Sequence, residues 1–276
     1  MITSQLKGGI GNVMFQVAAG YGLAAKLKAG ISFDLFEPSM IQQRMSYHGT
    51  TNYSYADNIL SNISNHKFDG KIIWKLVNEH QIDPRIKNLK KMVNRDVNYK
   101  LSGYFQSEVY FQHIRDEICK IYNIPRYIEH YIREKYNHIY KNNKTVSLHV
   151  RRGDYLNLPE SHPLCSLKYY HDAVDQLVDN DTKVLIFSDD IKWCRDNFKN
   201  DKFIYIQELD FICLYMMTKC NHNIIANSSF SWWGAWLNDK TGKQVIAPRP
   251  WLSTSHRDSQ WWDKNIYCDG WEVMGE

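Results

Sequence analysis

The sequence has no hydrophobic run long enough to cross a membrane and no recognisable export signal. No window approaches the ~20 consecutive apolar residues that a membrane-spanning helix needs. Residues 1–7 (MITSQLK) do not place a basic segment before an apolar one, which is the arrangement of a signal peptide. We therefore predict a cytoplasmic protein.

Cysteine is sparse, and none of it is spaced for metal binding or redox chemistry. The six cysteines are scattered along 276 residues, and none lies in a CxxC pair. Cys220 and His222 are close in sequence, but no second metal-spaced pair accompanies them. This pattern argues against a zinc site and predicts reduced, buried thiols.

The chain also lacks a strong charge of either sign. Its 34 Lys and Arg residues exceed its 30 Asp and Glu residues, for a formal net charge of +4. Such a small, dispersed excess argues against a nucleic-acid partner. It suits an anionic small substrate or an anionic membrane surface, and it leaves open a peripheral contact with the inner face of the membrane.

What the sequence does contain is enough apolar material for packed cores, since 43% of all its residues are hydrophobic. Near the N-terminus, residues 2–6 read as a strand, residues 13–28 as a helix and residues 31–36 as a second strand. A glycine-rich turn joins the first two. A strand, helix and strand in this order predict a βαβ unit with parallel strands.

The middle of the chain carries a weaker pattern. Residues 101–106 form its one clear strand and turn, and residues 116–140 read as a helix interrupted near Pro125. The polar run at 141–144 is the best candidate boundary. We therefore predict an N-terminal Rossmann-like domain at 1–143 and a C-terminal Rossmann-like domain at 144–276.

The second half alternates strand and helix patterns. Expected strands are 146–150, 184–187, 204–206, 223–226 and 245–247; expected helices are 167–178, 191–198, 208–219 and 229–237. This alternation predicts a second doubly wound parallel domain. Two such domains that face each other bind a ligand in the cleft between the carboxyl ends of their strands.

The segment from His149 to Asp154 (HVRRGD) follows the first of these strands. Arg151 and Arg152 offer planar, permanently charged donors for phosphate oxygens. An arginine pair is often a surface ion-pair cluster instead. The position at the end of a strand, with His149 and Asp154 on either side, favours a site.

A second candidate segment, 227–234 (NSSFSWWG), lies between a strand and a helix. Asn227, Ser228, Ser229 and Ser231 supply an amide and three hydroxyls beside a row of backbone N–H groups, which is a pattern typical of anion binding. The two tryptophans that follow fit a buried helix face better than a sugar-binding platform.

Three weaker signals accompany these segments. Asp210 begins an apolar helix. Its carboxylate could accept hydrogen bonds from guanine, or it could simply interact favourably with the positive end of the helix dipole. Asp189 ends a strand and could contact a ribose or shape a turn. The glycines at 8–11 suggest close approach to a ligand, but Met14 occupies the place of the third small residue that a dinucleotide fingerprint requires.

Segments 8–16, 149–155 and 227–235 together resemble the three hallmark segments of the α1,2-fucosyltransferases of glycosyltransferase family 11. They occur in the order of the family and span nearly the whole chain. Segments 187–190 and 210–222 are also similar to the family. Val13 departs from it, because many members carry Gln there.

The resemblance implies an α/β, GT-B-like fold with two Rossmann-like domains facing across a cleft. It implies GDP-β-L-fucose as donor, a galactose-terminated glycan as acceptor and no metal or other cofactor. The 144–276 domain would bind GDP-fucose, and the 1–143 domain would lie on the acceptor side. Arg151 would hold the β-phosphate, His149 and Asp210 the guanosine, the 228–231 segment the diphosphate, and Asn12 the sugar. The substrate-binding residues predicted in this way are Gly11, Asn12, His149, Arg152, Asp189, Asp210, Asn227, Ser228, Ser229 and Ser231.

The implied chemistry is an inverting displacement that forms an α1,2 linkage in a surface glycan. Arg151 would stabilise the leaving group. Asp154 is the first candidate base and Glu160 the second, although Asp154 could instead hold the arginines in place. A transferase for another sugar, a non-catalytic carbohydrate-binding module and, more remotely, a nicotinamide oxidoreductase are the alternative functions.

Overall fold

A computed structural model describes the protein over residues 1–35, 41–46, 49–68, 72–81, 96–253 and 264–275. The chain divides into two compact units. Unit 1 comprises Met1–Met45 and Thr50–Asn123, and unit 2 comprises Ile124–Glu276 together with Ser46–Gly49. No helix in the described part of the chain combines the length and apolar character that crossing a membrane requires.

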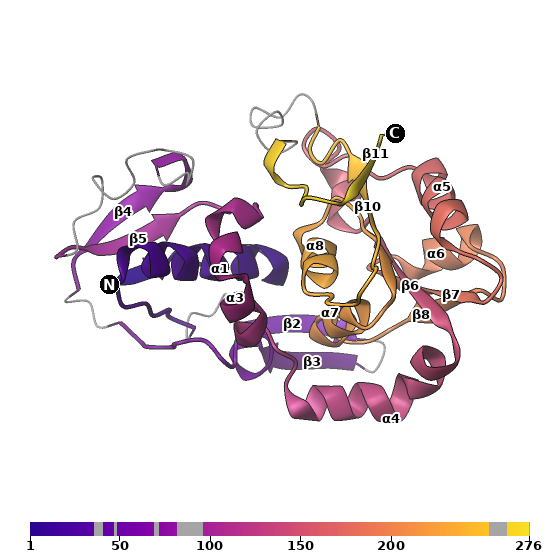
Figure 1. Ribbon diagram of the computed structural model, residues 1–276, viewed down its shortest axis with the longest axis horizontal. Helices are drawn as coiled ribbons and strands as arrows, with labels where there is room; N and C mark the ends of the chain where they lie inside the picture. The colour runs from indigo at the N-terminus through magenta and orange to yellow at the C-terminus, as the bar shows by residue number, and fades with distance from the viewer. Residues whose placement is uncertain (36–40, 47–48, 69–71, 82–95, 254–263, 276) are drawn as a thin grey trace. The chain divides into compact units, whose positions relative to one another are not determined.

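Unit 1 contains a three-stranded parallel sheet in the order β1, β5, β4. These strands are β1 (Ile2–Ser4), β5 (Asn98–Ser102) and β4 (Trp74–Asn78). Helix α1 (Ile10–Leu27) follows β1 and packs against it (Figure 1). The predicted order of strand, glycine turn and helix is therefore confirmed, and the helix begins at Ile10 rather than at residue 13.

The expected strand at 31–36 is wrong as a member of this sheet. Only isolated parallel bridges form there, from Ile31 to Ile2 and from Phe33 to Asn65, and Phe36 lies outside the described residues. The full-length partner of β1 is instead β5. Because the pairing of strands so distant in sequence leaves no local pattern, neither β4 nor the pairing of β1 with β5 could be predicted.

The rest of unit 1 consists of short elements. Strands β2 (Ile41–Ser46) and β3 (Gly49–Ser54) form a separate two-stranded sheet. Helix α3 spans Arg115–Ile121. Unit 1 also contains short 3₁₀ turns at Tyr55–Asp57, Glu79–Gln81, Glu108–Tyr110 and Gln112–Ile114.

Gly22 lets α1 approach the turn at Glu108–Tyr110. A Cβ at Gly22 would overlap the backbone carbonyl oxygen of Tyr110, which cannot swing aside as a side chain could. We expect Gly22→Ala to lower the free energy of unfolding by roughly 2–3 kcal/mol, as overpacking does. Chemical denaturation would measure it. Gly30→Ala is the matched control because a Cβ there meets nothing within 4 Å, and equal stability of the two variants would contradict this account.

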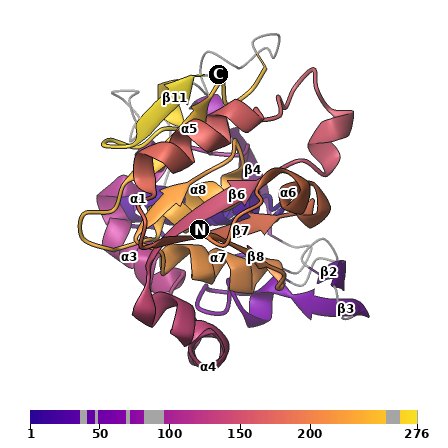
Figure 2. The ribbon, with the colours of Figure 1, turned by 90° about the vertical axis from the view of Figure 1, so that its right-hand side faces the viewer.

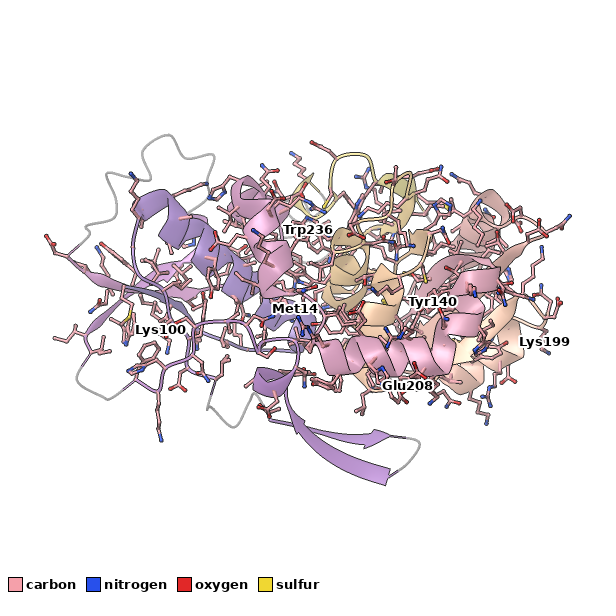
Figure 3. All side chains as sticks on the ribbon, turned by 60° about the horizontal axis from the view of Figure 1, so that its bottom comes forward. Met14, Lys100, Tyr140, Lys199, Glu208 and Trp236 are labelled. Atoms are coloured by element: carbon pink, nitrogen blue, oxygen red, sulfur yellow. The ribbon has the colours of Figure 1, made fainter. Side chains whose placement is uncertain are left out.

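Helix α4 (Arg126–Asn142) belongs to unit 2, so the structure divides the chain after Asn123 and not at the predicted boundary after 143. One contact that ties α4 to unit 2 is made by a carboxylate that is nearly buried. Glu208, whose side chain is 8% exposed, accepts hydrogen bonds from Tyr131 at 3.0 Å, Lys135 at 2.7 Å and Tyr136 at 2.5 Å. Figure 3 shows Glu208 beside the helix that carries these partners.

This contact has electrostatic consequences for α4. The hydrogen bond from Lys135 to Glu208 raises the pKa of Lys135, and burial, with Glu208 beside it, raises the pKa of Tyr136. Both shifts favour the protonated forms, which are the forms that donate to Glu208. The polar run that predicted a boundary at 141–144 is the end of α4 and the start of the next strand, not a linker between units.

Unit 2 is built on a six-stranded sheet in the order β11, β10, β9, β6, β7, β8, in which every neighbouring pair is parallel. The strands are β6 (Lys144–Val150), β7 (Thr182–Ser188), β8 (Phe203–Ile206), β9 (His222–Ile224), β10 (Val245–Arg249) and β11 (Glu272–Gly275). The predicted second doubly wound domain is therefore confirmed, with β11 as an additional strand that sequence reasoning missed.

Helices cover both faces of this sheet. Those on one face are α5 (Leu167–Leu177) and α6 (Ile191–Asn197), and those on the other are α7 (Asp210–Thr218) and α8 (Ser229–Trp236) (Figures 1 and 2). All four lie where the sequence pattern predicted helices. Gly234 of α8 brings it close to α7, since a Cβ there would lie 2.8 Å from the sulfur of Met217.

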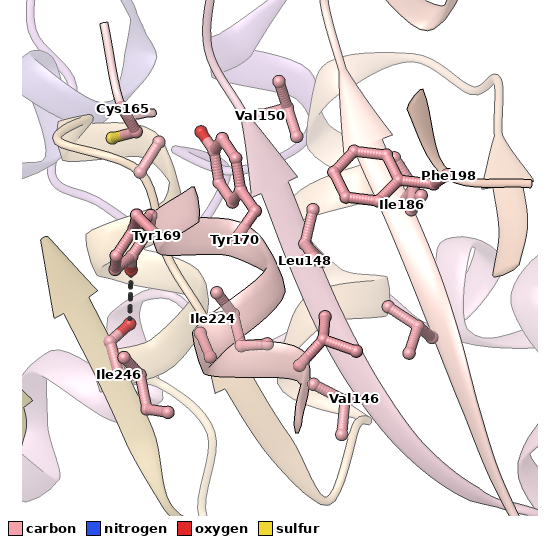
Figure 4. Close-up of a cluster of buried hydrophobic side chains, with 14 of the residues drawn as sticks. Val146, Leu148, Val150, Cys165, Tyr169, Tyr170, Ile186, Phe198, Ile224 and Ile246 are labelled. Carbon is pink, nitrogen blue, oxygen red and sulfur yellow. Dashed lines mark hydrogen bonds between the residues drawn. The ribbon is translucent and has the colours of Figure 1, made fainter. Parts of the chain in front are cut away.

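The core under α5 and α6 is apolar and closely packed (Figure 4). Val146, Leu148 and Val150 of β6 are fully buried in it. The Tyr169 hydroxyl donates to the carbonyl oxygens of Ile225 at 2.7 Å and Ile246 at 3.2 Å, so that this buried polar group is satisfied. The six cysteines are free thiols, and five of them are buried.

Candidate functional site

The connections of the unit 2 sheet diverge between β6 and β9. The chain passes from β6 to β7 and β8 on one side, and from β9 to β10 and β11 on the other. Open α/β sheets bind ligands at this kind of topological switch point, outside the carboxyl ends of the strands. The two segments singled out by sequence meet there, because 149–154 spans the end of β6 and 227–231 follows β9.

Arg151 is clamped between two carboxylates at this edge. Its Nη2 lies 2.6 Å from Asp154 Oδ1, and its Nη1 lies 2.9 Å from Asp189 Oδ2. The ring of Tyr155 lies 5.4 Å from the guanidinium carbon. The side chain is only 26% exposed. A planar guanidinium held at both of its ends is preorganised to present its remaining donors in one direction.

Asp189 holds the turn that carries the arginines. The register places Val150 of β6 opposite Ser188 of β7, so the residues that follow each strand are neighbours. Besides binding Arg151, Asp189 accepts a hydrogen bond from the backbone N–H of Arg152 at 2.9 Å. A Cβ at Gly153 would come within 2.6 Å of the same carboxylate. Of the two roles that the sequence allowed, the geometry supports turn shaping, since both carboxylate oxygens serve the arginine segment.

Arg152 points into a different environment from Arg151. Its Nε lies 3.2 Å from Asp190 Oδ2, and its guanidinium carbon lies 4.3 Å from the centre of the Trp193 ring. Asp190 in turn caps α6 by accepting from the backbone N–H of Trp193 at 3.0 Å. Arg152 therefore ties the site to α6, and its side chain is 18% exposed.

Tyr155 joins the two segments, a role that the sequence analysis did not assign. Its hydroxyl donates to the backbone carbonyl of Asn227 at 3.0 Å. Burial raises the pKa of Tyr155, so that the phenol keeps the proton it donates. The residue stands directly after the arginine motif, but only the neighbouring positions of β6 and β9 in the sheet reveal its partner.

The predicted anion-binding segment divides into residues that shape it and residues that line it. The Asn227 amide donates to the carbonyl oxygens of Pro163 at 2.8 Å and Trp251 at 3.1 Å. The Ser231 hydroxyl is buried and donates to the carbonyl oxygens of Ala226 and Ser228. These two side chains support the loop from within.

Ser228 and Ser229 stand at the start of α8. Ser228 is the N-cap of the helix, where its side chain accepts from the backbone N–H of Phe230. Ser229 is the first helical residue and is half-buried. Both stand where the positive end of the helix dipole favours an anion.

Two further predicted residues are nearly buried. His149 and Asp210 are each 5% exposed. The ring of His149, on β6, lies 5.5 Å from the ring of Phe230 on α8. Asp210 is the first residue of α7, and its Oδ1 accepts from the backbone N–H of Phe211 at 2.7 Å.

Three predicted site residues remain, namely Glu160, Gly11 and Asn12. Glu160 occupies an exposed turn beyond the 3₁₀ turn Asp154–Asn157. Gly11 and Asn12 belong to unit 1, in the first turn of α1. There the Asn12 side chain accepts a hydrogen bond from Gln106 at 2.5 Å, a partner that the sequence did not indicate.

The tryptophans of the second segment belong to the core, as predicted. Trp232 and Trp233 are fully buried, and the Trp232 indole donates to the carbonyl oxygen of Ile266 at 2.6 Å. Within the residues that the structure describes, no three His, Cys, Asp or Glu side chains gather in a way that could hold a metal ion.

Comparison with known proteins identifies relatives along nearly the full chain. The sequence pattern of glycosyl transferase family 11 matches residues 58–274. The O-antigen biosynthesis glycosyltransferase WbnK of Escherichia coli is 30% identical over 92% of this chain and 96% of its own. An alpha-1,2-colitosyltransferase of Escherichia coli is 28% identical over 94% of this chain and 95% of its own. Galactoside alpha-(1,2)-fucosyltransferase 1 of Bos taurus is 28% identical over 50% of this chain and 43% of its own.

A solved structure shares the fold. Fucosyltransferase NodZ from Bradyrhizobium superposes with a TM-score of 0.56 at 12% identity, covering 84% of this chain and 92% of NodZ. At that identity the likeness concerns the fold alone. It confirms the predicted α/β, GT-B-like class, to which the parallel sheets of both units conform.

Proposed function

Because the chain belongs to glycosyl transferase family 11, we propose that it transfers L-fucose from GDP-β-L-fucose to the 2-hydroxyl of a terminal galactoside in a surface glycan. Membership makes the chain a glycosyltransferase, which sets aside the carbohydrate-binding module and the oxidoreductase as alternatives. The α1,2 linkage is supported by two relatives whose names carry it, and the surface glycan by the O-antigen relative.

The observation that carries the proposal is the clamped guanidinium at the switch point. A diphosphate leaving group gains negative charge as its bond to the sugar breaks. Arg151 is permanently charged and held between Asp154 and Asp189. Ser228 and Ser229 begin the helix that follows β9, the neighbour of β6 in the sheet. These groups would bind the departing diphosphate without a metal, since preorganised donors stabilise the charge that develops in the transition state.

The proposed reaction is a single displacement with inversion at the anomeric carbon. The acceptor oxygen attacks that carbon, the bond from carbon to phosphate oxygen breaks, and GDP leaves with the electron pair. Asp154 would take the proton of the acceptor hydroxyl. Its side chain is 56% exposed, against 22% for Asp189, and so it is the Arg151 partner that a substrate can reach. Glu160 remains the second candidate base.

The remaining predicted residues take supporting roles in this proposal. His149 and Asp210 would bind the guanosine. Arg152, Asn227 and Ser231, whose side chains are already engaged within the protein, would act by holding the loops in shape. Unit 1 would receive the acceptor, and peripheral contact with the membrane remains a prediction from charge.

A second candidate donor is GDP-colitose, which the full-length match to a colitosyltransferase favours. Colitose is L-fucose without its 3-hydroxyl, so the two donors differ by one oxygen. A site that hydrogen-bonds a substrate hydroxyl rejects the analogue that lacks it by several orders of magnitude, whereas an apolar site discriminates weakly. The ratio of kcat/KM for the two donors therefore separates the candidates.

The deciding experiment is a transfer assay in excess EDTA with both GDP donors and a panel of terminal galactosides, followed by linkage analysis of each product. We expect fucose in α1,2 linkage and turnover that persists in EDTA. If product forms only from GDP-colitose, then GDP-colitose and not GDP-fucose is the donor. Turnover that returned only with added Mn²⁺ or Mg²⁺ would overturn the role given to Arg151.

Nucleotide selectivity should follow from Asp210. A carboxylate can accept from both the N1–H and the 2-amino group of guanine, a pair that neither adenine nor uracil presents. We expect GDP at ~100 times its Kd to stabilise the protein by roughly 2.7 kcal/mol, and ADP and UDP at the same concentration to stabilise it much less. Thermal melting with each nucleotide measures this. Asp210→Asn should reduce the preference for GDP, and equal shifts with all three nucleotides would refute the guanosine assignment.

A further inference from the structure

A group of polar and aromatic side chains in unit 1 includes Asn12, the residue that the family resemblance assigns to the sugar. It lies at the carboxyl ends of the parallel neighbours β1 and β5, where α/β sheets present ligand-binding residues. Tyr104 and Gln106 follow β5, and Asn12 comes from the first turn of α1 after β1. Tyr104 is 39% exposed, and Gln106 and Asn12 are half-buried.

Gln106 fixes the orientation of the Asn12 side chain. The Gln106 amide donates from Nε2 to Asn12 Oδ1 at 2.5 Å. Because the Asn12 oxygen is engaged, its amide nitrogen is turned away, toward Gly8, where a Cβ would lie 2.7 Å from it. Beyond this bond, the pair carries the NH₂ group of Asn12 and the carbonyl oxygen of Gln106. A sugar hydroxyl, which both donates and accepts, matches such a pair.

The frame around the pair is rigid. Gln16 is fully buried and makes two hydrogen bonds to the backbone of Lys7. Its side chain accepts from the Lys7 N–H at 2.9 Å and donates to the Lys7 carbonyl oxygen at 3.0 Å. The Lys7 ammonium lies 4.8 Å from the centre of the Tyr104 ring. The loop that leads to Asn12 is thus tied to the residue that follows β5.

Phe105 sits between the two exposed residues in an unusual backbone conformation. Its φ is 52°, a value that few bulky residues adopt. Its side chain is fully buried against Tyr110, with ring centres 5.4 Å apart. Burying Phe105 in this way leaves Tyr104 and Gln106 on the outer side of the turn. Strained residues of this kind persist where the surrounding structure holds them, often at ligand sites.

Gly9, the N-cap of α1, leaves space at the start of the helix that the fold itself does not require. Its φ of −68° suits any residue, and a Cβ there meets nothing within 4 Å. A serine would fit and would be a better N-cap for α1 than glycine.

We propose that Tyr104, Gln106 and Asn12 form a pyranose-binding site in which Gln106 is a positioning residue that aims the Asn12 amide at a sugar hydroxyl. Tyr104 supplies an aromatic surface for the ring, and Gly9 leaves room for it. This inference rests on the proposed function, because the pyranose is one of the two sugars of that reaction. The donor fucosyl group and the acceptor galactose share the required chemistry.

The test compares Gln106→Leu with the matched control Gln5→Leu. Gln5 is exposed at the same sheet edge and bonds Ser102 rather than Asn12. We expect Gln106→Leu to keep its Tm and its GDP affinity and to lose roughly 10- to 100-fold in kcat/KM, the range for a lost hydrogen bond and an unpaired partner. Gln5→Leu should keep its activity. Gln106→Glu, of equal size, should not restore activity, because a carboxylate cannot donate to Asn12.

Substrates that lack one hydroxyl identify the sugar and exclude a merely structural role. If the pair binds the donor, Gln106→Leu should narrow the kcat/KM ratio of GDP-fucose to GDP-colitose. If the pair binds the acceptor, the variant should instead narrow the ratio of kcat/KM for a galactoside to kcat/KM for its deoxy analogue. An equal loss with every substrate would overturn this inference alone. A wild-type protein inactive with both donors would overturn the proposed function, and this inference with it.

Gly9→Ser provides a second variant that does not depend on how Gln106 tolerates substitution. We expect it to be at least as stable as the wild type and to bind GDP equally well, but to transfer sugar at least 10-fold more slowly, because the new side chain occupies the space left for the pyranose. Unchanged transfer by Gly9→Ser would show that no sugar approaches there and would overturn the site.

Discussion

Arg151→Ala should lower turnover by roughly 10²–10³-fold, which is the loss typical when one preorganised donor to a developing charge is removed. The guanidinium is held at both ends, by Asp154 and Asp189, so the site presents it without reorganisation. Arg151→Lys should recover little of this loss, because an ammonium cannot reproduce a planar, two-point contact with phosphate oxygens. Steady-state kinetics with GDP-fucose and calorimetry with GDP measure both effects.

Two other arginines serve as controls for this result. Arg152→Ala should cost less turnover and more stability, since Arg152 is engaged by Asp190 and Trp193. Arg133, on α4, is 61% exposed, and Arg133→Ala should leave both properties unchanged. Retention of most of the turnover by Arg151→Ala would remove the guanidinium from the mechanism. Equal losses for Arg151→Ala and Arg152→Ala would mean that the segment needs only positive charge.

Unit 2 was predictable because its strands and helices alternate with short connections. Each buried parallel strand reads as a β-branched run, and each helix fills the gap to the next strand. Helices α5 to α8 lie within a few residues of their predicted ranges. Strand β11 could not be predicted because it lies at the edge of the sheet. Its residues Glu272 and Gly275 are exposed, so that the segment has no apolar run.

Unit 1 was less predictable because its sheet depends on pairing between distant segments. Strand β1 pairs with β5, almost a hundred residues later, and β4 is an edge strand with the exposed residues Lys75 and Leu76. The residues at 31–36 carry strand-like alternation, yet Ile31 forms only one bridge with β1. Local periodicity cannot distinguish a strand that completes a sheet from one that touches it once.

The same distinction applies to the candidate site. Arg151, Asp154 and Asp189 were identifiable from motifs at strand ends, and the structure brings them together. What sequence could not show is how each motif is supported. The bond from Tyr155 to the backbone of Asn227 and that from Gln106 to Asn12 cross between elements. Such partners follow from the order of strands in a sheet, which no single motif contains.

Asp154→Asn should retain GDP affinity within about threefold and lose roughly 10²–10⁴-fold in turnover, the contribution typical of a general base. Asparagine keeps the size of the side chain and can still accept a hydrogen bond from Arg151, but it cannot take a proton from the acceptor hydroxyl. The acidic limb of the pH profile of kcat should disappear with the carboxylate. Calorimetry with GDP beside turnover across pH measures both properties.

Asp189→Asn is the matched comparison, because it removes the other carboxylate of the same clamp. Asp189 accepts from both Arg151 and the backbone of Arg152, so its loss should weaken GDP binding and turnover together while the pH profile keeps its shape. If Asp154→Asn also weakened binding and turnover in parallel, Asp154 would be a second positioning residue. In that case Glu160, exposed in the turn beyond it, would be the next base to test. Loss of the acidic limb in Glu160→Gln would then assign the proton transfer to Glu160, and the Arg151 clamp would serve the leaving group alone.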